Sequence, residues 1–188
     1  MQINPALLII DLQNDFIKNE NSPVFIPSGK NIVQSIINIR ELFALKKLFI
    51  FNIITVHSTN KNEWGKKDIE LSRSYCIETT KGAEIIDELL PLKNNEIIIK
   101  KKFYSAFFET DLLEKLKEYK ITDLYFTGLT TGCCVSSTAR DAYNYKFNLF
   151  FVKDALTATS LTAHEYELAF FQKSLGAVID SAEIINYF

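Results

Sequence analysis

The chain is 188 residues long and 47% of its residues are hydrophobic, which is typical of a folded α/β domain and excludes a largely disordered chain. Its formal net charge of -2 gives no general attraction to nucleic acid or to anionic lipid, so we expect neither as a partner. Three cysteines, two of them the neighbours Cys133 and Cys134, are too few for a disulfide framework and favour a reducing, cytoplasmic location.

Short runs rich in Ile, Leu, Val and Phe predict buried strands, because strands covered on both faces of a parallel sheet are continuously apolar. In chain order these runs cover residues 6–10, 48–56, 96–100, 123–127, 147–152 and 177–180. The first run is far too short to span a bilayer, which needs about 20 apolar residues, and it lacks the basic leader and cleavage site of a signal peptide. We therefore expect a buried strand there and no membrane partner.

Amphipathic stretches lie between these runs, and they predict helices over residues 31–47, 83–90, 111–119, 135–145 and 162–175. No long linker and no internal repeat divides the chain. Alternating strands and helices are typical of a parallel sheet with helices on both faces. The sequence therefore predicts a single α/β domain over residues 1–188, a three-layer sandwich with a mostly parallel sheet flanked by helices.

Polar residues directly after the apolar runs are the candidates for a functional site, because in open α/β sheets the chemistry lies beyond the carboxyl ends of the strands. Asp11 ends the first run. A carboxylate in this place suits a general base, and an aspartate that caps a helix or forms a turn explains it about equally well.

Three consecutive lysines, Lys100 to Lys102, follow the third run. Such a run usually lies in a solvated loop. Here the aromatic-rich residues 103–107 come next, and they should fold toward the core and bring one lysine with them. A buried ammonium needs an anionic partner, which a carboxylate or a thiolate would supply.

The fourth run leads into a turn over residues 127–135, with two cysteines near the start of the next helix. Free N–H groups at a helix N-terminus favour a thiolate, and a nearby lysine would lower the pKa of the thiol further. Cys134 is therefore the candidate nucleophile, whereas Cys76 and Cys133 are expected to be small buried apolar residues. A redox pair of Cys133 and Cys134 is disfavoured, because redox dithiols have a two-residue spacer.

Taken together, three segments resemble the isochorismatase-like cysteine hydrolases, and they cover residues 6–16, 101–112 and 128–142. Residues 81–85 and 154–159 are lesser matches, so the resemblance extends over nearly the whole chain. It implies Asp11, Lys101 and Cys134 as the catalytic residues. Lys101 is the lysine that matches because the family lysine lies three residues before the aromatic residue, here Tyr104.

The resemblance also implies a cis peptide bond between Leu129 and Thr130, which would aim the N–H groups of Thr130 and Cys134 into an oxyanion hole. In the implied mechanism Asp11 accepts the thiol proton, the sulfur attacks an amide or ureido carbonyl, and water hydrolyses the thioester. The expected function is hydrolysis of a C–N bond in a small molecule.

Individual residues favour or disfavour the other activities found in the family that this chain resembles. Nicotinamidases add a metal site of an aspartate and histidines after the second strand, and here Thr55 stands in place of the aspartate, two residues before His57. Three protein ligands are the usual minimum for a catalytic metal, so we expect no metal and no cofactor, although nicotinamide stays possible as substrate. An isochorismatase-type ether hydrolase is disfavoured by Cys134, and a catalytically silent binding protein is disfavoured because all three catalytic residues are present.

The nucleophile segment and residues 154–159 are most similar to hydrolases of ureido compounds, such as ureidoacrylate, biuret and N-carbamoyl amino acids. Phe16, Tyr104 and His57 are the expected substrate-binding residues, and ordinary packing is the alternative for each. Trp64 is a further candidate for the pocket or for a subunit contact, and His164 is expected at the surface or at a helix start. Family members are usually dimers or tetramers, so we expect a homo-oligomer.

Overall fold

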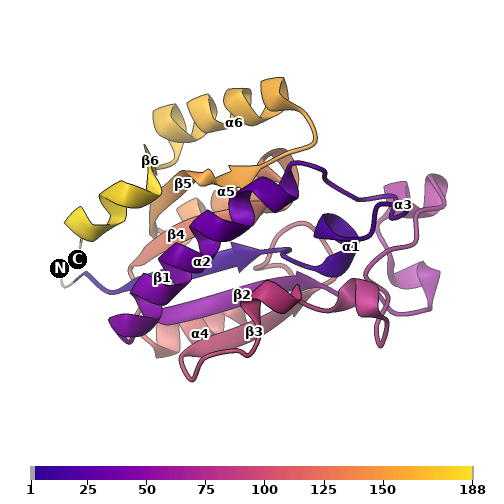
Figure 1. Cartoon of the computed structure of the whole chain (residues 1–188), viewed down its shortest axis with the longest axis horizontal. Helices are drawn as coiled ribbons and strands as arrows, with labels where there is room; N and C mark the ends of the chain where they lie inside the picture. The colour runs from indigo at the N-terminus through magenta and orange to yellow at the C-terminus, as the bar shows by residue number, and fades with distance from the viewer. Residues whose placement is uncertain (1–2, 188) are drawn as a thin grey trace.

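One parallel sheet organises the chain, as Figure 1 shows. The computed structural model describes residues 3–187. The sheet has six strands in the order β3-β2-β1-β4-β5-β6, and every neighbouring pair is parallel. The strands are β1 (Pro5–Ile10), β2 (Phe49–Thr55), β3 (Glu96–Lys101), β4 (Asp123–Leu129), β5 (Asn148–Thr157) and β6 (Ala177–Ile179). This confirms the predicted α/β fold.

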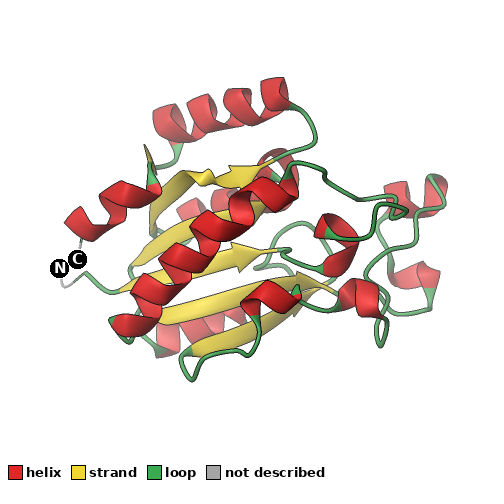
Figure 2. Cartoon of the chain, in the orientation of Figure 1, coloured by secondary structure: helices red, strands yellow, loops and turns green. Residues whose placement is uncertain are grey.

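Helices cover both faces of the sheet, which gives the three layers seen in Figure 2. α2 packs on one face, while α4, α5 and α6 belong to the core on the other face. The short helices α1 and α3 lie beyond the carboxyl ends of the strands. The helices are α1 (Asn14–Ile17), α2 (Gly29–Leu45), α3 (Lys66–Glu70), α4 (Leu112–Glu118), α5 (Ser136–Asn144) and α6 (Leu161–Ser174).

The side chains of β1 alternate between the two cores. Leu7 and Ile9 pack on the face of α2, and Leu8 and Ile10 pack on the opposite face, all within 1% of complete burial. Each such side chain stabilises the fold by about 1.5–3 kcal/mol relative to an exposed position. β1 is thus a rigid central element, and the residue that follows it is held in a fixed place.

The predicted helix over residues 83–90 is wrong. Two short 3-10 helices, Lys81–Ala83 and Asp87–Leu89, flank an extended stretch instead. The extended residues pair with the loop after β1, because Asn14 N donates to Glu84 O at 3.0 Å and Ile86 N donates to Leu12 O at 3.1 Å. These tertiary hydrogen bonds replace the ones that a helix would have made, and they fix the loop behind Asp11.

Gly128 marks a close approach between β1 and β4 at the end of the sheet where the polar residues gather. Its φ is +103°, and a Cβ at this position would lie 2.1 Å from the carbonyl oxygen of Ile10. Only glycine fits such a contact. The two strands therefore end side by side, which brings the residues after Ile10 close to those after Leu129. Over residues 3–187, no helix is both long and apolar enough to span a membrane.

Candidate active site

The carboxyl ends of four neighbouring strands bring the predicted catalytic residues together. Asp11 directly follows β1, Thr55 and Lys101 are the last residues of β2 and β3, and Cys134 lies in the turn between β4 and α5. All four side chains are buried, with exposed fractions of 1% for Asp11, 4% for Thr55, 2% for Lys101 and 8% for Cys134. Parallel strands end at the same edge, so residues far apart in sequence meet there.

The backbone of Asp11 turns sharply out of β1. Its φ is +58°, in the left-handed region that aspartate tolerates better than most residues. Its N–H donates to the carbonyl oxygen of Ile53 at 2.9 Å, so the backbone stays attached to β2 while the strand ends. The turn directs the carboxylate toward the ends of β2 and β3, where it meets the lysine.

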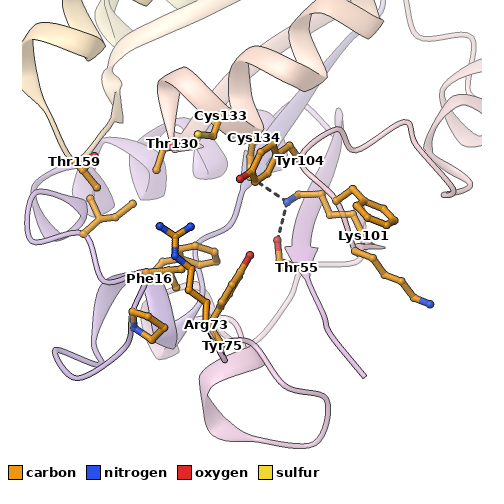
Figure 3. Close-up of a pocket in the computed structure, with 15 residues that line it drawn as sticks. Phe16, Thr55, Arg73, Tyr75, Lys101, Tyr104, Thr130, Cys133, Cys134 and Thr159 are labelled. Atoms are coloured by element: carbon orange, nitrogen blue, oxygen red, sulfur yellow. Dashed lines mark hydrogen bonds between the residues drawn. The ribbon is translucent and has the colours of Figure 1, made fainter. Parts of the chain in front are cut away.

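Lys101 is the centre of the hydrogen-bond network. Its Nζ donates to Asp11 Oδ2 at 3.0 Å, to Thr55 Oγ1 at 2.7 Å and to Cys134 Sγ at 3.3 Å. An ammonium has three protons, so each of them has an acceptor. Figure 3 shows the Nζ between the Thr55 hydroxyl and the cysteine, with both contacts dashed. The sequence predicted a carboxylate or a thiolate as the partner of the buried lysine, and both the carboxylate of Asp11 and the sulfur of Cys134 are in contact with it.

Thr55 has a role that the sequence did not reveal. Its hydroxyl accepts from Lys101 and donates to Asp11 Oδ1 at 2.8 Å, so it bridges the two charged groups. Gln13 fixes this threonine from behind, because its side-chain oxygen accepts from Thr55 N at 2.8 Å and its amide donates to Thr55 O at 2.7 Å. A threonine that ends a strand opposite a buried lysine is the only signal in the sequence that could have indicated the bridge.

The charges of the network are strongly coupled. Burial by itself would lower the pKa of Lys101, but the neighbouring Asp11 and Cys134 raise it above its usual value, so the lysine stays protonated. Burial raises the pKa of the Cys134 thiol, the charge of Asp11 raises it further, and Lys101 offsets only part of this increase. Lys101 lowers the pKa of the thiol as expected, but the expectation of a lowered pKa overall is wrong, because burial and Asp11 outweigh the lysine. The resting thiol holds its proton and needs a base.

The turn that carries Cys134 is a single π-helical turn, Thr131–Val135, which leads directly into α5. The peptide bond between Leu129 and Thr130 is cis, as predicted. Thr131 anchors the turn, since its hydroxyl lies 2.9 Å from Thr157 O and 2.8 Å from His164 Nδ1. His164 lies in the first turn of α6, at a helix start as predicted, and it is half-buried against the turn.

The two neighbouring cysteines face different environments. Cys134 is buried beside Lys101, whereas Cys133 is exposed and lines the cavity above it. The prediction that Cys133 is buried is wrong, since it lies on the side of the π-helical turn that faces the cavity. Cys76 is buried as expected, and its N–H donates to Asp15 Oδ2 at 2.7 Å.

A cavity of about 170 Å³ opens above Lys101 and Cys134. This volume suits a small molecule. Phe16 and Tyr104 line it, as the sequence predicted, and Thr130 lines it beside the cysteine. Thr159, at the end of the matching segment 154–159, also lines it, whereas Arg73 and Tyr75 come from a segment that carries no recognisable motif.

His57 does not line the cavity, contrary to the prediction. Its ring stacks on Trp64 at 4.2 Å between centroids and meets the Tyr75 ring edge-on at 4.9 Å, and Tyr75 separates it from the cavity. Trp64 is also buried, and its indole N–H donates to Ser58 O at 2.9 Å. Burial lowers the pKa of His57, and neither ring nitrogen has a hydrogen-bond partner among the described residues. These aromatic rings support the wall of the pocket.

The side chains near His57 do not fit a catalytic metal. Among residues 3–187, no three His, Cys, Asp or Glu side chains come together as a ligand set. The hydroxyl of Thr55, in the place of a metal-binding aspartate, is a neutral group that already bonds Lys101 and Asp11. Because a catalytic metal usually has three protein ligands, we derive no chemical step through one.

Comparison with known proteins finds relatives over nearly the whole chain. The family model described as an isochorismatase domain matches residues 5–183. The isochorismatase family protein PncA of Bacillus subtilis is 31% identical over 180 residues, which cover 93% of this chain and 97% of that protein. A probable inactive nicotinamidase of Arabidopsis thaliana is 31% identical over 171 residues, 86% of this chain and 84% of the relative. The crystal structure of the nicotinamidase/pyrazinamidase PncA of Bacillus subtilis superposes with a TM-score of 0.87 at 29% identity, and covers 95% of this chain and 100% of that one.

Proposed function

Since the chain belongs to the isochorismatase family, we propose that it is a cysteine-dependent amidohydrolase that cleaves the C–N bond of a small amide or ureido compound. Asp11, Lys101 and Cys134 are the proposed catalytic residues. The observation that carries the proposal is the buried ammonium of Lys101, which donates to a carboxylate, a hydroxyl and a thiol at the base of a cavity. Burying an ammonium and a carboxylate beside a cysteine costs stability, and such charged clusters at the base of a cavity are typical of functional sites.

The first half of the proposed reaction forms a thioester. Cys134 Sγ attacks the carbonyl carbon of the substrate, and its proton passes to Asp11 as the S–C bond forms. Because burial raises the pKa of the thiol, transfer to a base during attack explains the geometry better than a thiolate that is already present. Lys101, at 3.3 Å from the sulfur, stabilises the negative charge that develops there.

The tetrahedral intermediate then collapses. Its oxygen carries a full negative charge, and the N–H groups of Thr130 and Cys134 are the proposed donors to it, because Thr130 lines the cavity next to the nucleophile. Asp11 returns the proton to the leaving nitrogen, the C–N bond breaks, and ammonia or an amine leaves.

Water completes the cycle. Asp11 takes a proton from a water molecule, the resulting hydroxide attacks the thioester, and the sulfur leaves and regains its proton. The net reaction adds one water across the C–N bond. A ureido substrate also yields ammonia in the end, whichever of its C–N bonds breaks, because the carbamate formed decomposes. We further propose, from the family resemblance, that the enzyme works as a cytoplasmic homo-oligomer.

Ammonia release from the purified protein, before and after treatment with a chelator, tests the proposal. The compounds are nicotinamide, ureidoacrylate, biuret and N-carbamoyl amino acids. We expect release that resists the chelator, disappears in Cys134→Ala and persists in Cys133→Ala, the matched control on the neighbouring residue. Release that is unchanged in Cys134→Ala would contradict the mechanism. No release from any compound would favour a silent binding protein, an alternative that the relative described as a probable inactive nicotinamidase supports.

A further inference from the structure

The cavity above Cys134 is lined by positive charge. Arg73, Lys101 and Lys102 line it, and no Asp or Glu among residues 3–187 does. Each of the three cations has an acidic neighbour. Lys101 is committed to the catalytic network, and Lys102 pairs with Glu63 at 2.6 Å, with both side chains partly exposed. Arg73 has only a long ion pair with Asp68, at 3.4 Å, so it is the cation with the most donor capacity left for a molecule in the cavity.

The guanidinium of Arg73 points into the cavity. Figure 3 shows it beside Phe16, on the side of the cavity opposite Lys101. Its side chain is 36% exposed, and its one side-chain hydrogen bond within the described part of the chain is a long contact of 3.4 Å from Nη1 to Asp68 Oδ1. A guanidinium has five N–H donors in a flat fork, so most of the fork is free to bind a ligand.

Asp68 holds the arginine from behind without filling the pocket. It is 6% exposed, does not line the cavity, and also accepts from the Tyr75 hydroxyl at 3.2 Å. The contact with Arg73 is too long to satisfy the guanidinium, but it orients the side chain. The arrangement resembles a preorganised anion receptor, in which a buried acid positions a cation and the cation faces the ligand.

We propose that Arg73 binds a carboxylate group of the substrate, so that the substrate class is small amides or ureido compounds that carry a carboxylate. The proposal rests on the proposed function of Cys134. An arginine fork matches the two oxygens of a carboxylate bidentately, and the donors that Asp68 leaves unused face the cavity. The carboxylate lies at one side of the cavity and the scissile carbonyl lies over Cys134. A cavity of about 170 Å³ leaves room for only a few bonds between the two groups.

Matched compounds test the charge alone. Three pairs share a skeleton and differ by an isopropyl group in place of the carboxylate: N-carbamoylglycine and isobutylurea, N-carbamoyl-β-alanine and 3-methylbutylurea, succinamate and 4-methylpentanamide. Every member can release ammonia. We expect the wild-type protein to favour the acid over its neutral partner in at least one pair by about tenfold or more, because a charge-assisted hydrogen bond is lost in the neutral compound.

Variants of Arg73 then assign the preference to this residue. Arg73→Gln should lower kcat/KM for the acid about 10- to 100-fold, mainly through KM, and change that for the neutral partner by less than about twofold. Arg73→Lys should recover part of the loss, because it keeps the charge without the fork. Lys67→Gln is the control for losing a positive charge nearby, since Lys67 is exposed, pairs with Glu70 and does not line the cavity. It should leave both members unchanged.

Calorimetric binding of the same pairs to Cys134→Ala separates this inference from the proposed function, because binding needs no turnover. Tighter binding of an acid than of its neutral partner, abolished by a second change Arg73→Gln, supports the role of Arg73 even if no compound is hydrolysed. Equal binding of acid and neutral partner in every pair, a preference that survives Arg73→Gln, or no binding of any acid would overturn it. Hydrolysis of both members at equal rates would overturn it while leaving the amidase intact.

Discussion

Replacing Thr55 by valine removes the hydroxyl that bridges the buried charges and keeps the shape of the side chain. Lys101 loses the acceptor at 2.7 Å, and Asp11 loses the donor at 2.8 Å. Hydrogen bonds to charged groups contribute about 1.5–3 kcal/mol each, and the gain from burying a methyl group offsets part of the loss, so we expect a destabilisation of roughly 2–4 kcal/mol. For a domain of this length, that lowers Tm by about 5–15 °C.

Activity should fall as well, because the freed ammonium no longer holds one orientation between Asp11 and Cys134. We expect kcat to fall about 10- to 100-fold with little change in KM, since Thr55 acts by positioning groups that stabilise charge in the transition state. Thr55→Ser keeps the hydroxyl and should retain most of both stability and kcat. Thermal unfolding and steady-state ammonia release measure the two effects. A Thr55→Val protein with the Tm and kcat of the wild type would refute the bridging role.

Three further variants test the surroundings of the site. His57→Phe keeps the stack on Trp64 and removes two buried nitrogens without partners, so Tm at pH 7.5 should not fall. Burial holds the pKa of His57 below its unfolded value of about 6.5, so the unfolded chain binds the proton more readily than the folded chain. The wild-type protein should therefore lose stability as the pH falls from 7 to 5, and His57→Phe should lose less. If the Tm of the wild-type protein rose as the pH fell from 7 to 5, a lowered pKa for His57 would be contradicted. His164→Phe removes the bond to Thr131, which anchors the turn that carries Cys134. We expect kcat to fall while Tm changes little, with activity and unfolding measured on the same sample. Gly128→Ala places a Cβ 2.1 Å from Ile10 O at φ +103°, and chemical denaturation should show a loss of at least about 3 kcal/mol or no folded protein.

The fold was predictable from local pattern, and the three proposed catalytic residues were predicted from local pattern together with the family resemblance. Continuous apolar runs marked the buried strands, and a polar residue that ends such a run, as Asp11 does, has to lie at the edge of the sheet. The aromatic continuation predicted that one of the three lysines is buried, and Ala106 and Phe107 do pack in the core, but only the resemblance selected Lys101. The terminal position of Cys134 followed from the strand-to-helix turn.

The failures depend on contacts that no local pattern records. Residues 83–90 have helical periodicity, yet Glu84 and Ile86 bond to the loop after β1 and stay extended. The sequence indicated Thr55 only as a residue in place of a metal ligand. Its bridging role depends on the ends of three strands lying side by side, which no local pattern shows. His57 lies two residues after the end of β2, as expected of a pocket residue, but Tyr75, 18 positions later, covers it. Arg73 had no motif at all, since its place in the cavity is set by the course of a loop.

Identification of the residue that carries the acyl group tests the central claim most directly. The protein is mixed with a compound that it hydrolyses, quenched in acid during turnover, digested, and analysed by mass spectrometry. The proposed mechanism predicts an acyl or carbamoyl adduct on Cys134, enriched in quenched over untreated protein and absent in Cys134→Ala, which should release no ammonia. An adduct confined to Cys133, or turnover by Cys134→Ala at the wild-type rate, would contradict it.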